Sequence, residues 1–187
     1  MKTFLVSAIA AMAFLYHASA QAPLQPGSVK ITRIDPSGVK TPEYTIQGGP
    51  QKRSKVGTWL EIEVEFETKG EQIAELKFDY MVAIENKLVT GTVSHVLIPG
   101  GKDHFSVMYI APRTLEKLTG GKPLTSASVQ NVWISVSSPD GVQLDGKGSP
   151  KNGPPPNVAR MPGLLNKMET PFAPLFFDRY EAIKPTK

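Results

Sequence analysis

Residues 57–68 read GTWLEIEVEFET, and this stretch decides the fold class. Four glutamates alternate with four apolar residues, and alternate side chains of a β-strand point to opposite faces. The apolar set is predicted to face a core; it comprises Leu60, Ile62, Val64 and Phe66. The other face carries Trp59, Glu61, Glu63, Glu65 and Glu67. The alternation therefore predicts a strand with one buried and one wet face.

The glutamate row is the densest cluster of ionisable groups in the chain. General acid/base catalysis needs two carboxylates in different environments, and calcium needs oxygens that converge on one point. Carboxylates spaced about 7 Å apart along a straight strand diverge and share one environment. We expect a solvated strand face here, with an electrostatic or edge-protecting role as the alternative.

Short alternating or apolar runs recur between turn signals along the rest of the chain. We predict strands near Ser28–Asp35, Val56–Thr68, Ala74–Ile84, Lys87–Ile98, His104–Ala111, Ser128–Ser137 and Val142–Asp145. The excursion from Pro36 to Lys55 is expected to cross one end of the sandwich. About seven strands in a domain of this size predict an all-β, immunoglobulin-like antiparallel β-sandwich.

The chain divides into three predicted parts. Residues 1–20 have an early cation, an apolar stretch and a final Ala18-Ser19-Ala20, which is typical of a signal peptide. The immunoglobulin-like sandwich is expected over residues 28–148. Residues 149–187 are expected to form a Pro/Gly-rich linker and an apolar segment that docks back, since a free tail is rarely this hydrophobic. We expect export to the periplasm, outer membrane or cell surface, with no membrane span after cleavage.

The composition narrows the chemistry. The chain has no cysteine, which excludes a thiol nucleophile, a disulfide and a cysteine-based metal site. The formal net charge of +4 is mild. The one tight basic cluster, residues 52–55, is too short to indicate nucleic acid as a partner.

No catalytic or metal-binding motif is present in the sequence. His95 and His104, with Asp103, offer three ligand types but lack the close spacing of a metal site. Ser94 and His95 are neighbours on a strand and point to opposite faces, and there is no G-x-S-x-G motif. We expect no enzymatic activity, no cofactor and no metal.

Large aromatic residues on nominally wet faces are the candidate contact sites. Trp59 and Trp133 both fall on the outward parity of their strands. Phe172, Phe176 and Phe177 belong to PFAPLFFDRYEAI, residues 171–183. Three hypotheses stay open: this segment covers one tryptophan, the tryptophans form an exposed platform for a glycan or partner, or a local bulge turns the indole inward.

Four features together suggest a family: the leader, WLEIEVEFE, the hairpin NVWISVSSPDGVQLDG and the ending TPFAPLFFDRYEAIKP. They resemble small secreted immunoglobulin-like proteins of verrucomicrobial gut bacteria, encoded beside type IV pilus-like genes. The resemblance implies a role in pilus-associated assembly or adhesion, with other envelope or pilus-associated proteins as partners. Self-association is also expected. The alternative function is a carbohydrate-binding or hydrolase accessory module.

Overall fold

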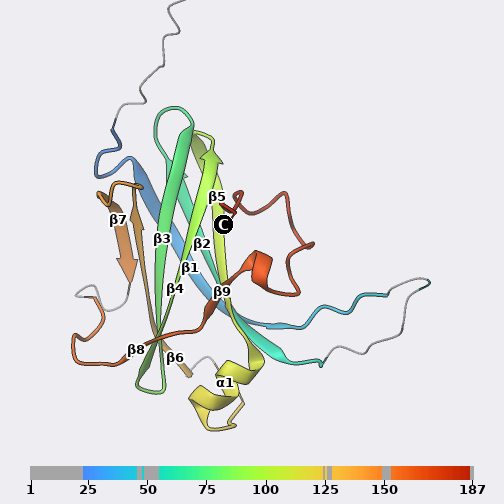
Figure 1. Ribbon diagram of the computed structural model, residues 1–187. Coiled ribbons are helices and arrows are strands. Elements are labelled where there is room, and N and C mark those ends of the chain that lie inside the picture. Colours follow the sequence, from blue (N-terminus) through green and yellow to red (C-terminus); the bar gives the residue numbers. More distant parts are fainter. Residues whose placement is uncertain are drawn as a thin grey trace, which may run out of the picture.

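The computed structural model describes residues 23–45, 48, 55–123, 125, 128–148 and 153–185, which form two packed β-sheets (Figure 1). One sheet has the strand order β1-β2-β5-β9, and the other has the order β7-β6-β3-β4-β8. The first sheet consists of β1 (Val29–Lys40), β2 (Thr58–Thr68), β5 (Gly101–Ile110) and β9 (Leu164–Asn166). The second consists of β7 (Gln143–Gly148), β6 (Val129–Ser137), β3 (Ile73–Ile84), β4 (Lys87–Ile98) and β8 (Arg160–Pro162). A short helix, α1 (Pro112–Thr119), follows β5, and a 3-10 turn spans Lys167–Glu169.

The predicted all-β sandwich is confirmed, while its immunoglobulin-like topology stays a prediction. The described residues form nine strands instead of about seven, because the C-terminal region adds β8 and β9. The predicted excursion is wrong for residues 36–40, which continue β1 and pair with β2. Pro36 is tolerated there because β1 is an edge strand, where a missing N–H need not break a ladder.

The core lies between the two sheets and is built by the alternation seen in the sequence. The four apolar residues predicted from β2 are almost fully buried, as are Leu76, Phe78, Tyr80 and Val82 of β3. Since β2 and β3 belong to different sheets, Glu65 does not oppose Lys77. The chain passes from β3 to β4 through Glu85 and Asn86, which both have positive φ, as a tight two-residue hairpin requires.

The C-terminal residues join the two sheets along one side of the sandwich. Strand β8 pairs in parallel with β4, and β9 pairs antiparallel with β5 in the opposite sheet. Further on, the N–H of Val96 in β4 donates to the carbonyl of Ala182, and the N–H of Glu181 donates to the carbonyl of Phe105 in β5. We call residues 160–185 the closing segment, because it fills the seam between β4 and β5; it is orange to red in Figure 1.

Two predicted features fall partly or wholly outside the described residues. The predicted signal peptide, residues 1–20, lies outside them entirely, and the basic cluster at residues 52–55 is described only at Lys55. Within the described ranges, no helix has the length and apolar character needed to cross a membrane.

Candidate functional site

An aromatic cluster covers the outer face of the first sheet, where the closing segment lies on β2 and β5. The rings of Phe172 and Tyr109 stack with centroids 4.6 Å apart and planes inclined by 5°. Trp59 meets Phe172 edge-on, with centroids 5.6 Å apart, and its indole N–H donates to Thr41 Oγ1. Such pairs each add about 1 kcal/mol beyond the burial of their area. Trp59 is therefore 8% exposed, and the closing segment is what covers it.

The same segment covers part of the glutamate row, so the expectation of a solvated face is wrong there. Both carboxylate oxygens of Glu63 accept hydrogen bonds from the guanidinium of Arg179, at 3.0 and 2.7 Å. The Tyr180 hydroxyl donates to the same carboxylate at 3.0 Å. The bond from Arg179 outweighs desolvation and holds the pKa of Glu63 below its usual value. The guanidinium also lies 3.8 Å from the centroid of the Phe105 ring.

Glu61 differs from its three neighbours in the row. Glu63 and Glu65 form ion pairs with Arg33, and Glu67 forms one with Lys102. Within the described part of the chain, no ion pair reaches Glu61. Burial, helped by the negative charge of Glu63, raises the pKa of Glu61 against the smaller lowering effects of hydrogen bonds from Tyr109 and Ser37 and of the charge of Arg179. It is a carboxylate taken partly out of water with no ion pair of its own, and the charge of Arg179, which Glu63 holds, is the smallest of the influences on it.

A cleft of about 560 Å³ lies between the outer face of β2, the end of β1 and the closing segment. Its polar lining comprises Lys40, Glu61, Glu63, Arg179 and Tyr180, and its apolar lining comprises Val39, Pro42, Phe172, Leu175 and Phe176. The Tyr44 hydroxyl donates to the carbonyl of Pro171 and so ties the loop after β1 to the closing segment. The residues that line the cleft are therefore held from both sides.

A buried chain of hydrogen bonds lies under the closing segment. The Tyr80 hydroxyl is 2.6 Å from Ser106 Oγ, which is 2.7 Å from His95 Nε2. The Nδ1 of His95 lies 3.0 Å from the carbonyl oxygen of Glu181, to which it can only donate. In the neutral ring the proton therefore lies on Nδ1, and Nε2 accepts from the Ser106 hydroxyl. Burial lowers the pKa of His95 to about 4.

The pairing of Ser106 with His95 resembles a nucleophile and its base, and sequence reasoning missed it because the two residues lie on different strands. Both side chains are fully buried, so no substrate reaches the hydroxyl in this structure. The chain of donors and acceptors fixes the closing segment in register instead. A second histidine, His104 of β5, contacts the carboxylate of Glu181 at 2.7 Å. No three histidine, aspartate or glutamate side chains converge as metal ligands among the described residues.

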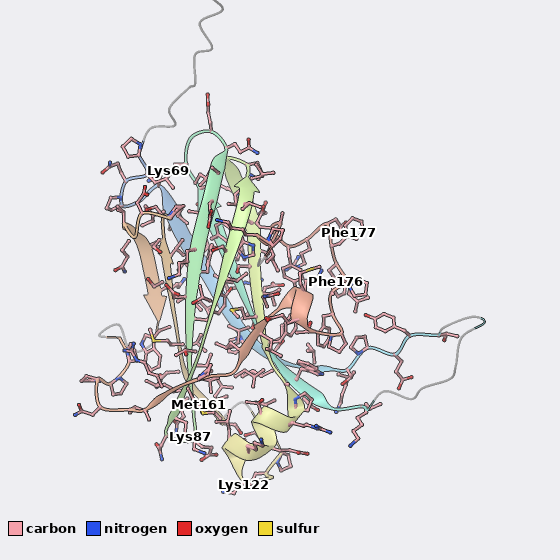
Figure 2. The ribbon with its side chains drawn as sticks, viewed as in Figure 1. Lys69, Lys87, Lys122, Met161, Phe176 and Phe177 are labelled. Carbon is pink, nitrogen blue, oxygen red and sulfur yellow. The ribbon has the colours of Figure 1, made fainter. Side chains whose placement is uncertain are left out.

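The two remaining phenylalanines do not take part in the packing. Phe176 is 63% exposed and Phe177 is 80% exposed, and Figure 2 shows both rings pointing away from the sandwich. Phe176 also has a φ of 50°, a left-handed conformation that is uncommon for a bulky residue. The expectation that Phe176 and Phe177 pack the tail onto the sandwich is therefore wrong. That packing is made by Phe172, Leu175 and Tyr180.

Trp133 lies on the opposite sheet and has different cover. It is 5% exposed and packs with Ala83, Leu88 and Val158, the last of which precedes β8. Gly148 of β7 allows the indole to lie close, because a Cβ there would be 2.3 Å from the ring. Neither tryptophan is exposed and they lie on different sheets, so they form no flat platform. The bulge hypothesis is also wrong, since both indoles remain outside the central core.

Fold and site define the class: a two-sheet β-sandwich whose seam is closed by its own C-terminal segment. A protein-family model matches residues 20–187, and the chain belongs to the family that this model describes. The crystal structure of a protein from Akkermansia muciniphila, a verrucomicrobial gut bacterium, has a similar fold. The TM-score is 0.72 and the sequence identity 21%, with 85% of this chain and 94% of that chain covered. No curated protein matches the sequence.

Proposed function

We propose that the protein is an exported, non-enzymatic interaction protein of the cell envelope that takes part in pilus-associated assembly or adhesion. The observation that carries this proposal is the adjacent pair Phe176 and Phe177, exposed at the tip of the closing segment. An exposed aromatic pair has a cost in solubility, and a left-handed phenylalanine has a cost in backbone energy. Both costs are understandable if the pair is buried against a partner.

The turn that presents the pair is fixed at both ends. Phe172 is buried in the aromatic cluster before it, and Arg179 is bound to Glu63 after it. Within the turn, the N–H of Leu175 donates to the carbonyl of Phe172, and that of Arg179 donates to the carbonyl of Phe176. Aromatic side chains held by a rigid support lose little entropy on binding, which is typical of interface hot spots.

The double variant Phe176→Ser/Phe177→Ser tests this proposal. The mature chain is immobilised and exposed to native envelope extract, and the bound proteins are identified while the chain's mass is measured in solution. We expect pilus-associated proteins, or further copies of the chain, to bind the wild type and to be lost from the variant by tenfold or more. This corresponds to more than about 1.4 kcal/mol, as expected for an aromatic hot spot.

Leu97→Ser is the matched control. Leu97 is 64% exposed and has a φ of 58°, so it resembles Phe176 in exposure and backbone, but it lies on β4. Equal loss of binding in both variants, or no loss in either, would contradict the proposal. Capture of polysaccharide alone would support the carbohydrate-binding alternative instead.

A further inference from the structure

We infer that the cleft beside Phe176 binds a lysine or arginine side chain of a partner polypeptide, with the carboxylate of Glu61 as its counter-ion. The inference rests on the proposed function, because it names the chemistry of the partner at the same surface. It is carried by a contact that the chain already makes with itself at Glu63, two residues further along the same face of β2.

The internal contact is that of Arg179 with Glu63. The carboxylate of Glu63 holds the guanidinium with two hydrogen bonds, while the Phe105 ring lies against its flat face. Tyr180 adds a hydrogen bond to the same carboxylate. A carboxylate on this face of β2, flanked by aromatic rings, is thus a binding site for a basic side chain.

Glu61 repeats this arrangement without the cation. It lies two residues before Glu63, on the same face of β2, and it lines the cleft together with Phe172 and Phe176. The Tyr109 and Ser37 hydroxyls stabilise its charge only in part, and burial dominates. The fold has already removed part of the hydration of this carboxylate. A cation that binds here therefore gains the Coulomb attraction while less additional desolvation opposes it.

The other charges at the cleft do not supply this cation. The guanidinium of Arg179 donates its hydrogen bonds to Glu63, and its charge has the smallest of the effects that act on Glu61. The ammonium of Lys40, three pairs along the β1–β2 ladder from Glu61, donates to Thr58 Oγ1 at 2.8 Å and makes no ion pair with Glu61. Lys40 and Arg179 thus have other partners, and Glu63 is already paired. Glu61 is the carboxylate of the cleft that an external cation can pair with.

The shape and surroundings of the cleft favour a side chain on a polypeptide. Leu175, Val39 and Pro42 offer apolar contact for the aliphatic stem of a lysine or arginine. Phe176, which lines the cleft, and its neighbour Phe177 are exposed apolar side chains. A small free amine has no further groups that could contact these two rings. A basic residue flanked by other residues of a chain uses both parts.

The test is a titration of the mature chain with short blocked peptides, followed by the carboxyl carbon and amide signals of Glu61 in NMR spectra. The peptides are acetyl-Gly-Lys-Gly-amide, its arginine counterpart, and versions with norleucine or acetyl-lysine. We expect the two basic peptides to bind with Kd on the order of millimolar and to lower the pKa of Glu61. The two uncharged peptides should bind at least tenfold more weakly.

Variants locate the site. Glu61→Gln keeps the shape and one acceptor oxygen but removes the charge, and it should weaken binding of the basic peptides about tenfold. Glu67→Gln, in the same row but paired with Lys102, is the matched control and should bind as the wild type does. Dispersed amide spectra of both variants establish that each is folded.

Several results would overturn the inference. These are equal binding of the norleucine peptide, unchanged binding by Glu61→Gln, or binding of n-butylamine as tight as that of the lysine peptide. If no peptide binds but Phe176→Ser/Phe177→Ser still loses its envelope partners, the inference fails and the proposed function stands. If the basic peptides bind at Glu61 but Phe176→Ser/Phe177→Ser keeps all of its envelope partners, the proposed function fails. The claim that the cleft binds a side chain of a polypeptide partner then fails with it.

Discussion

At the scale of single residues, His95 shows how the closing segment is held. Its ring is fully buried, lies edge-on to Phe78 and contacts Ser106 and the backbone of Glu181. Two ionisable side chains take part in the surrounding contacts: Tyr80, which contacts Ser106, and Glu181, whose carboxylate contacts His104 instead. Among the described residues, no carboxylate lies against the ring to stabilise an imidazolium, and desolvation keeps the histidine neutral.

This arrangement predicts a loss of stability in mild acid. The pKa of His95 is about 4 in the fold and about 6.5 when exposed, so between these values the unfolded chain binds a proton that the folded chain does not. This contribution to stability is present above pH 6.5 and falls by about 1.4 kcal/mol per pH unit as the pH drops toward 4. Urea unfolding at pH 7, 6 and 5 would measure it.

His95→Gln is the comparison for this prediction. Glutamine has no such proton to bind, so the variant should be less stable at pH 7 but its stability should fall less steeply with acid, by roughly one proton. Identical slopes for the two proteins would show that another group controls the acid response.

At the scale of elements, the path of the closing segment depends on a close approach at Gly91 of β4. A Cβ at this position would lie 2.5 Å from the Cβ of Leu164 and 2.9 Å from its carbonyl oxygen. The chain crosses from β8 to β9 at this point, between the two sheets. Glycine at this position therefore allows the crossing at van der Waals distance.

Gly91→Ala should move β9 away from β4 and lower the free energy of unfolding by about 1–3 kcal/mol, the usual cost of overpacking. Gly38→Ala in β1 is the control, because a Cβ there would lie at an ordinary 3.5 Å from Thr58. Its stability should stay within about 0.5 kcal/mol of the wild type. Equal effects of the two substitutions, measured by urea unfolding, would mean that the approach of Leu164 is not close in solution.

At the scale of the whole molecule, the sandwich could be predicted from local alternation, while the site could not. Period-two patterns identify the inward residues of β2 and β3 and place Trp59 and Trp133 on outer faces. The partners of those outer faces come from far along the chain: Arg179 is 116 residues from Glu63. Nothing in the local sequence around Glu63 indicates that distant pairing.

The two exposed phenylalanines show the opposite limit of sequence reasoning. A run as apolar as PFAPLFFDRY indicates burial, and Phe172, Leu175 and Tyr180 do pack on the sheet. Phe176 and Phe177 point outward because the turn places Phe176 at positive φ, which hydrophobicity does not encode. The sequence therefore predicts docking of the segment but not which of its aromatics stay free for a partner.

The central claim is that the closing segment is a fixed part of the sandwich and so presents a rigid binding surface. Amide hydrogen exchange of the unmodified mature chain tests it most directly, at Glu181 and Lys184, whose N–H groups donate to Phe105 and Ser94. We predict protection at both positions, and at Val96 of β4, which donates to the segment from the other side, comparable to that of the central strand β3. Exchange at the rate of an unstructured chain at Glu181 and Lys184, with Val96 equally unprotected, would contradict the claim.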